Sequence, residues 1–207
     1  MTQYGFYFDA TRCTACKTCV LACKDYKDLP VTYAFRNVIE YGGGTWTQDE
    51  KGAWSTDTYV YNISAACNNC DNPACVIAAN GGIVKDEETG IVYIADQSLI
   101  EDPEIVAMVC PYSVPKVDPE SGLLVKCNSC MERVVEGKNP ICVDACSTRA
   151  LGWGPIEELR AMYGDLAEMA PLPSAELTMP NVVFKAPANC KPVDDTTGMV
   201  LNTPDIQ

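Results

Sequence analysis

Strand-like and helix-like patterns flank the cysteine-rich loops near both ends of the chain. Residues 4–9 alternate enough to predict a strand, and residues 18–26 predict a short helix. The same order returns later, with a strand predicted at 123–126 and a loop and helix at 127–146. We therefore expect one lobe that is built from both ends of the core.

Two hairpins are predicted in the middle of the chain. Residues 82–95 contain IVK and IVYIA on either side of a turn that ends at Gly90. Residues 113–127, SVPKVDPESGLLVKC, repeat this plan around a turn that ends at Gly122. The predicted fold class is α+β, with two lobes related by a pseudo-repeat.

Aromatic residues are concentrated between the first cysteine loop and residue 67. They are Tyr26, Tyr33, Phe35, Tyr41, Trp46, Trp54, Tyr59 and Tyr61. One interpretation is packing on strand faces, which aromatic side chains favour. The other is a docking surface for a partner, where Trp and Tyr are enriched. We expect Gly42, Gly43, Gly44 and Trp46 to form a flexible tip.

The C-terminal quarter begins with the strongest helical pattern. Residues 155–169 predict a helix with proline at its first position. One side of it carries Ile156, Leu159, Met162, Tyr163 and Leu166. The proline-punctuated segment PLPSAELTMPNVVFKAPANCKP follows, and we expect it to be an extended arm. This arm either wraps a partner or returns over the chain's own surface.

Composition excludes several classes of function. The 207 residues carry a formal net charge of -13, which argues against binding nucleic acid or an anionic membrane. The chain has no histidine, which removes histidine-ligated haem, Rieske centres and most catalytic zinc sites. It also removes the commonest general base, as suits a non-catalytic chain. No apolar stretch approaches the about 20 residues of a membrane span.

Thirteen cysteines dominate the candidate chemistry. Cys13, Cys16, Cys19 and Cys23 have the spacing C-x2-C-x2-C-x3-C, with which bacterial ferredoxins hold iron–sulfur clusters. Disulfides are a poor alternative, because cysteines at these intervals do not easily reach disulfide geometry and the count is odd. Zinc fits the later Cys-x2-Cys pairs when they are taken alone, but not the first run.

The ferredoxin rule assigns two sets of ligands. In that rule the last cysteine of each run crosses to the other cluster. Set one then consists of Cys13, Cys16, Cys19 and Cys146, and set two of Cys23, Cys127, Cys130 and Cys142. The middle of the chain offers Cys67, Cys70 and Cys75 as three ligands of one further cube. Cys110, followed by Pro111, resembles the end of another run.

Longer motifs extend this likeness over nearly the whole chain. They are YGFYFDATRCTACKTCVLACKDYKDL, SAACNNCDNPAC, VKCNSCMERVVEGKNPICVDACSTRAL, GPIEELRAMYGDLAEMAPLP and PNVVFKAPANCKP. In these motifs the chain resembles the four-cluster ferredoxin-like subunits of the dimethyl sulfoxide reductase family of molybdenum and tungsten enzymes. The resemblance implies two ferredoxin-like lobes that hold [4Fe–4S] clusters.

The chain departs from the family's pattern in its two middle runs. Where the resemblance implies four more cysteines, the sequence has Ala79, Ile100, Pro103 and Val106. Under the crossing rule these four belong to one cube, while Cys67, Cys70, Cys75 and Cys110 remain as a complete set three. We therefore expect three [4Fe–4S] clusters and one vacated site. Either side chains fill that site to interior density, or the segment 79–109 has refolded.

The predicted organisation has four parts. They are a first lobe with two clusters (1–30 plus 120–152), an aromatic-rich insertion (31–62), a second lobe with one cluster and the vacated site (63–119), and a helix with a C-terminal arm (153–207). Cys190 lies in the arm without a partner motif and is expected to be a free thiol.

The resemblance implies an electron-transfer subunit that exchanges electrons with a molybdenum or tungsten bis-pterin catalytic subunit. A membrane anchor or a soluble donor completes the expected partners. The alternative is a largely structural subunit of a transhydroxylase-like enzyme without net electron flow. A free-standing ferredoxin fits the insertion and the arm poorly. The N-terminus, MTQYGFYFDA, shows no export signal, so we expect a cytoplasmic chain or export of the folded chain with a twin-arginine-bearing partner.

Overall fold

The computed structural model describes residues 2–206 and has an α+β fold, as predicted. Its strands are β1 (Tyr4–Asp9), β2 (Asn37–Gly43), β3 (Trp46–Gln48), β4 (Trp54–Thr56), β5 (Tyr59–Ala65), β6 (Ile83–Lys85), β7 (Val92–Ile94), β8 (Lys116–Val117), β9 (Leu124–Val125), β10 (Leu151–Pro155), β11 (Val182–Lys185) and β12 (Gly198–Val200). Its helices are α1 (Thr18–Tyr26), α2 (Ala74–Ala78), α3 (Pro103–Met108), α4 (Met131–Val134), α5 (Ile141–Asp144) and α6 (Ile156–Tyr163). Short 3-10 helices are η1 (Gln97–Leu99), η2 (Ala175–Leu177) and η3 (Thr203–Asp205).

A three-stranded sheet of β10, β1 and β11 forms the central packing unit. β1 pairs with β10 antiparallel and with β11 parallel, so three distant segments of the chain meet. Five of the six residues of β1 are buried, and α6 packs against this sheet through Ile156 and Leu159. The strand predicted at 4–9 and the helix predicted at 18–26 are confirmed with these bounds.

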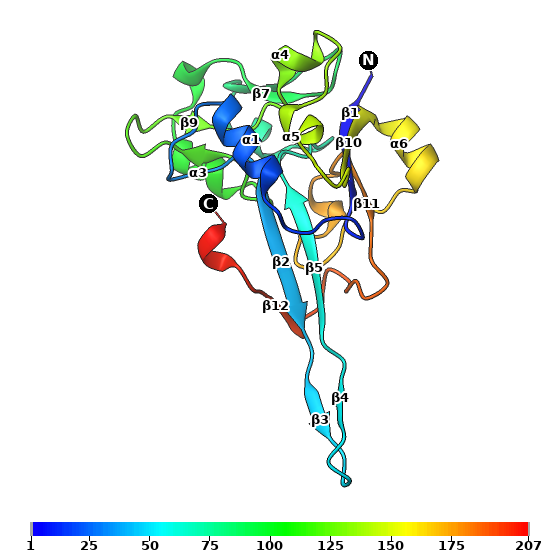
Figure 1. Cartoon of the computed structure of the whole chain (residues 1–207). Helices are drawn as coiled ribbons and strands as arrows, with labels where there is room; N and C mark the ends of the chain where they lie inside the picture. Colours follow the sequence, from blue (N-terminus) through cyan, green and yellow to red (C-terminus); the bar gives the residue numbers. More distant parts are fainter. Residues whose placement is uncertain (1, 207) are drawn as a thin grey trace.

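A long hairpin of β2 and β5 projects from the body and continues into the two-stranded β3–β4 extension (Figure 1). β12 pairs with the other edge of β2. The expected flexible tip at Gly42, Gly43 and Gly44 is wrong, because the first two belong to β2 and pair with β5 and β12. The end of the hairpin lies at residues 49–52, where the Asp49 carboxylate accepts hydrogen bonds from two backbone amides.

The two predicted small hairpins are confirmed as β6–β7 and β8–β9. Their turns match residue for residue. The backbone oxygens of Asp86 and Asp118 each accept a hydrogen bond from the glycine amide four positions on, Gly90 and Gly122. Both glycines have φ near +70°, a left-handed conformation that glycine adopts without strain. These equal turns support the internal pseudo-repeat.

The helix predicted at 155–169 is shorter than expected. It ends at Tyr163, because Gly164 has φ of 92° and leaves the helical conformation. Leu166 therefore lies outside the helix, and both Met162 and Leu166 are exposed. The arm that follows returns over the chain's own surface, where it supplies β11 and β12 to two different sheets.

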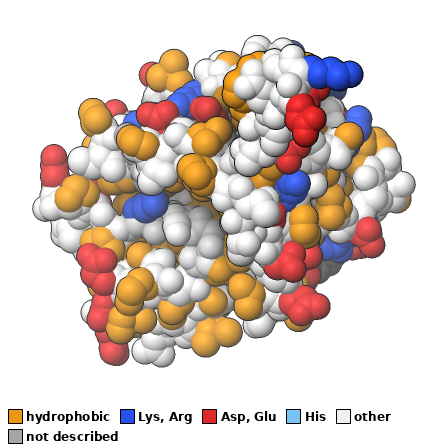
Figure 2. Space-filling view, turned by 90° about the horizontal axis from the view of Figure 1, so that it is seen from below, with side chains coloured by type: hydrophobic (Ala, Val, Ile, Leu, Met, Phe, Trp, Pro, Cys, Tyr) orange, Lys and Arg blue, Asp and Glu red, His pale blue; other side chains and the backbone are white. Residues whose placement is uncertain are grey.

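The aromatic residues of the insertion divide into two groups. Tyr41, Tyr59 and Tyr61 are buried against the core, whereas Trp46 and Trp54 on the extension are each 62% exposed. Figure 2 views the molecule from the side on which the hairpin projects and shows hydrophobic side chains at the surface among charged ones. Within residues 2–206, no helix has the length and apolar character needed to cross a membrane.

Candidate iron–sulfur sites

The cysteines of set one line one small cavity. Cys13, Cys16 and Cys19 come from the loop before α1 and the start of that helix, and Cys146 follows α5. Phe8, Val38 and Leu151 complete its apolar wall. Cys16 is exposed, and hydrogen bonds from Thr18 lower the pKa of its thiol to about 7. Set one therefore combines buried thiols with one at the surface.

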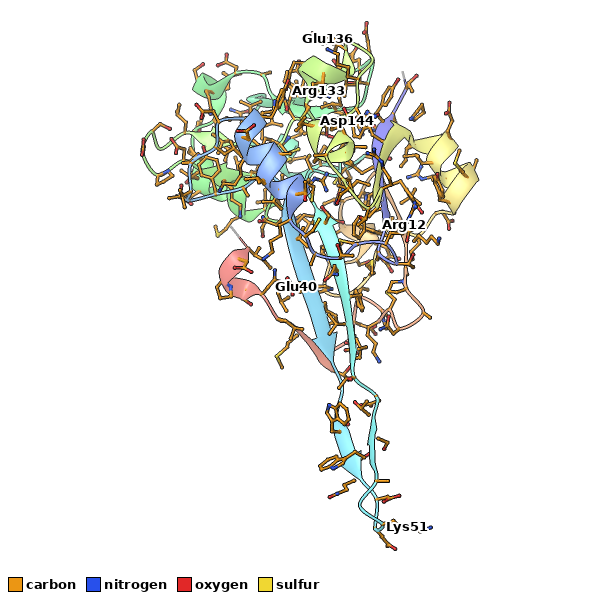
Figure 3. All side chains as sticks on the ribbon, in the orientation of Figure 1. Arg12, Glu40, Lys51, Arg133, Glu136 and Asp144 are labelled. Atoms are coloured by element: carbon orange, nitrogen blue, oxygen red, sulfur yellow. The ribbon has the colours of Figure 1, made fainter. Side chains whose placement is uncertain are left out.

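Set two lies where α1 and α5 pack side by side. Cys23 is on α1, Cys142 is on α5, and Cys127 and Cys130 come from the loop after β9. Burial raises the pKa of the Cys23 thiol, and the other three thiols raise it further by charge repulsion. Two ion pairs brace this region: Lys27 with Glu132 at 2.5 Å, and Arg133 with Asp144 at 2.6 Å. Figure 3 labels the second pair beside α4 and α5.

Set three lines a second cavity. Cys67, Cys70, Cys75 and Cys110 surround it together with Pro73, Val92, Val114 and Pro115. Burial raises the pKa of the Cys70 thiol to about 12 and that of Cys75 to about 11. Lys126 also lines this cavity, and its Nζ donates hydrogen bonds to the backbone oxygens of Val92 and Cys127. Thiols in such sites deprotonate when a metal replaces the proton.

The first Cys-x2-Cys loop of each set has one backbone feature in common. The residue before the second cysteine is left-handed in each loop, with φ of 54° at Ala15, 47° at Asn69 and 53° at Ser129. The amide of Ser129 donates a hydrogen bond to Cys127 Sγ at 3.3 Å. The amides of Ala15 and Asn69 form the equivalent bonds to Cys13 and Cys67. Hydrogen bonds to sulfur are one means by which a protein tunes an iron–sulfur cluster.

Electrostatic coupling orders the three sets. Burial is the largest cause of the raised pKa at Cys142 of set two, and Cys19 of set one adds to it. Burial likewise dominates the raised pKa at Cys67 of set three, where Cys127 of set two adds to it. Packing gives the same order: Cys142 of set two shares a buried cluster with Cys19 and Cys146 of set one, and Cys127 of set two shares another with Cys67 and Cys75 of set three. Set two therefore lies between set one and set three.

Three of the four positions of the expected vacated site lie beside set three. Ala79, Ile100 and Val106 are buried in one apolar cluster that also contains Cys67 and Cys75. Val106 is on α3, where it corresponds to the third cysteine of each other run. Pro103 is the first residue of α3 and is half-buried. The segment thus keeps a short helix at the expected place and packs side chains there.

The donor chemistry of the three sets fits iron–sulfur clusters. All thirteen cysteines are free thiols, and twelve belong to the three sets. Among the described residues, no three His, Cys, Asp or Glu side chains are arranged to hold a single metal ion. Four thiols around a cavity suit a cube with four irons, whose ligands stand farther apart than those of one ion. Cys190 lies outside the sets, half-buried, with its thiol 3.5 Å from the Lys191 carbonyl oxygen.

Two buried cations beside these thiols were not predicted from the sequence. Arg36 and Lys126 are 2% and 6% exposed. Lys126 directly precedes Cys127, so its position next to a predicted ligand could have indicated that it lies near a cluster. Arg36 lies 13 residues after Cys23 and 31 before Cys67, and no local pattern connects it with a cysteine.

Comparisons with known proteins agree with this geometry. A family model described as a 4Fe-4S dicluster domain matches residues 58–156. The protein is 46% identical over 205 residues, 99% of its own length and 99% of the relative, to the B subunit of anaerobic dimethyl sulfoxide reductase from Escherichia coli (strain K12). It is 33% identical over 178 residues, 76% of its own length and 79% of the relative, to formate dehydrogenase 2 subunit beta (cytochrome c-553) of Nitratidesulfovibrio vulgaris.

A third relative, like the formate dehydrogenase subunit, matches about three quarters of this protein. The protein is 30% identical over 157 residues, 75% of its own length and 78% of the relative, to the thiosulfate reductase electron transfer subunit PhsB of Salmonella typhi. These similarities confirm the resemblance that the sequence motifs predicted. This polypeptide therefore belongs to the [4Fe–4S] iron–sulfur subunits of the dimethyl sulfoxide reductase family of oxidoreductases.

Proposed function

We propose that this protein relays electrons through three [4Fe–4S] clusters to or from a molybdenum or tungsten bis-pterin catalytic subunit of a reductase. The observation that carries this proposal is the succession of three complete thiol sets, in which set two shares one buried cluster with set one and another with set three. A row of clusters offers successive one-electron steps, whereas a structural metal site needs no such row.

The residues of the chain would hold and tune the clusters. When bound, each cluster accepts and releases one electron. The twelve thiolates of the three sets hold the irons, and the amides of the left-handed loop residues donate to the sulfurs. Lys126 places a positive charge beside set three. The chain itself carries out no substrate chemistry in this proposal.

Set one is the proposed point of electron exchange with the catalytic subunit. Its Cys16 thiol is exposed, whereas Cys23, Cys127, Cys130 and Cys142 of set two are all buried. A cluster with one ligand at the surface lies within reach of a redox centre on an adjacent polypeptide. The other end of the row is set three, where Cys70 and Cys110 are half-buried.

We infer that the fourth site is filled by side chains, so the row ends at set three. Supporting this, Ala79, Ile100 and Val106 pack in the same apolar cluster as Cys75. Side chains packed to interior density leave no room for a cube. The electron donor must therefore approach set three directly.

The β3–β4 extension is the proposed contact for the catalytic subunit. Trp46 and Trp54 stand outside the body of the protein and are each 62% exposed. Large exposed aromatic rings are favoured at the centres of protein interfaces. The names of the relatives describe individual subunits of larger enzymes, which supports a partner subunit at this surface.

Native mass spectrometry of the anaerobically purified protein tests the cluster count. We expect a mass increment of three [4Fe–4S] clusters, about twelve irons by the ligand count. An increment of four would contradict the filled site, because non-cysteine ligands would then have to hold the last cube. An increment below three would contradict one of the three ligand sets.

Substrate-dependent reoxidation tests the relay. The complex with its catalytic partner is reduced with dithionite and mixed with dimethyl sulfoxide or thiosulfate, the substrates named for the relatives. The relay predicts that cluster absorbance returns as substrate is consumed, and that Cys67→Ser abolishes turnover with an external donor. Full turnover of Cys67→Ser would instead support a structural role.

Binding to the catalytic partner tests the extension. We expect Trp46→Ala combined with Trp54→Ala to weaken binding by at least about tenfold, since aromatic contacts at interface centres each contribute about 1 kcal/mol or more. Met199→Ala on β12 is a matched control, because Met199 is also exposed but lies on a different strand. Unchanged affinity of the double variant would place the interface elsewhere.

A further inference from the structure

Arg36 is a buried cation at the residue before β2. Its side chain is 2% exposed, and its guanidinium carbon lies 4.6 Å from the centre of the Phe6 ring. A buried charge is costly unless another charge or several hydrogen bonds compensate for it. Among the ion pairs of residues 2–206, none joins Arg36 to a carboxylate.

Only one guanidinium nitrogen has an oxygen acceptor within the described residues. Nη1 donates to the backbone oxygen of Ser64 at 3.0 Å and to Ser64 Oγ at 3.1 Å. Nε and Nη2 are buried and find no oxygen or nitrogen partner among residues 2–206, although the Cys142 thiol interacts with the guanidinium. Buried donors without partners are rare in folded proteins, and they indicate a group that the polypeptide alone does not supply.

Thiols of two different sets surround this guanidinium. Ser64 Oγ lies 3.4 Å from Cys19 Sγ of set one, so one hydroxyl group touches both Arg36 and that thiol. The Cys142 thiol of set two interacts with the same guanidinium through a side-chain hydrogen bond. An arginine guanidinium keeps its proton in proteins. Arg36 therefore carries a buried positive charge beside thiols of both sets.

The geometry points to Arg36 as a shared counter-charge that raises the reduction potentials of the clusters in sets one and two. It is a positioning residue that holds charge and hydrogen bonds near the clusters and binds no iron. The inference rests on the proposed function, since it requires clusters in both sets. On reduction a cluster takes one electron from its donor, no bond to Arg36 forms, and the added negative charge is stabilised by the nearby cation.

Redox titration of the full-length protein monitored by electron paramagnetic resonance tests this role. Dithionite supplies the electrons, and Cys13→Ser and Cys130→Ser variants assign the signals of sets one and two. We expect Arg36→Met to lower both potentials by about a tenfold change in the one-electron equilibrium constant, which is about 59 mV. Arg36→Lys should leave both reduction potentials close to those of the wild type, because lysine keeps the positive charge.

A surface charge provides the control. Lys51 lies at the far end of the hairpin (Figure 3), so Lys51→Met removes one positive charge without approaching a thiol. Its potentials should equal those of the wild type. An Arg36→Met protein that keeps three clusters and shows unchanged potentials would overturn the proposal, as would an equal shift in Lys51→Met.

Ser64→Ala provides an independent test if Arg36→Met fails to assemble its clusters. It preserves the guanidinium charge and removes the hydroxyl group between Arg36 and Cys19. We expect the potential of set one to fall more than that of set two, and an unchanged set one potential would contradict the shared role. Iron content distinguishes failure of the electron relay from failure of the role of Arg36. A wild-type protein without clusters in sets one and two would refute the proposed function itself.

Discussion

The thiol-bearing helices and α3, to which the predicted pseudo-repeat assigns equivalent places, are stabilised differently. α1 buries only its two cysteines, Cys19 and Cys23, and α5 buries Cys142 and Val143. α3 instead buries Val106 within an apolar cluster. The comparison teaches that one loop-and-helix plan can be completed either by metal ligands or by packed side chains.

Local capping follows the same division. α1, α2 and α5 have no side-chain hydrogen bond at their N-caps. α3 has Asp102, whose carboxylate accepts from the amide of Ile105, and Pro103 at its first position. Both features stabilise a helix start. The segment without thiols thus carries the local signals that the thiol-bearing helices lack.

The largest expected effect is on cluster number. Cys75→Ala on α2 should reduce the iron content from about twelve to about eight, because each cube needs its ligand set. Val106→Ala, at the equivalent position of α3, should leave it unchanged. Iron analysis together with native mass spectrometry measures both. Loss of iron in Val106→Ala would mean that the filled site still holds metal.

The next largest effect is expected when iron is removed, because the backbone amides of the helices should then differ in their protection from hydrogen exchange. After oxidative chelation we expect amide protection in α1 and α5 to fall steeply, since these helices bury mainly ligands. Protection in α3 should fall much less, and α6, which buries Ile156 and Leu159, is an internal control. Hydrogen exchange with mass spectrometry gives these values by segment. Equal loss of amide protection in α1 and α3 would contradict the idea that only α1 depends on bound iron.

A substitution in the packed cluster should have a smaller effect, on stability alone. Ile100→Ala is expected to destabilise the holoprotein by about 2–4 kcal/mol, through lost burial and the cavity left behind. Ile105→Ala on the same segment is the matched control, because Ile105 is 49% exposed and should change stability by less than about 0.5 kcal/mol. Urea unfolding midpoints under anaerobic conditions compare them. Similar midpoints would show that the site is loosely packed.

The smallest expected effect concerns the start of α3. Asp102→Ala should cost about 1 kcal/mol, because the amide of Ile105 loses its acceptor. Asp102→Asn keeps an acceptor and should retain most of the stability. Both variants should bind the full complement of iron. If urea midpoints cannot distinguish Asp102→Ala from the wild type, the cap contributes nothing to the packed site.

The sequence by itself determined the elements that depend on neighbouring residues. The strand at 4–9, the helix at 18–26 and the two small hairpins were predicted because periodicity and turn glycines act within a few residues. Sets one and two join cysteines more than 100 positions apart, so they were predicted from the ferredoxin crossing rule, and set three was completed through the family resemblance. All three sets remain predictions until the clusters are counted. The end of α6 was missed because the apolar pattern continues beyond Gly164, whose backbone conformation stops the helix.

Only the tertiary structure decided which distant segments meet. β11 joins β1, and β12 joins β2, through pairings between residues more than 150 positions apart. No local pattern predicts such pairing, because a strand's partner is chosen by packing and register rather than by its own residues. Arg36 is the sharpest case: an arginine is ordinarily exposed, and only the closure of the fold around sets one and two buries its charge among thiols.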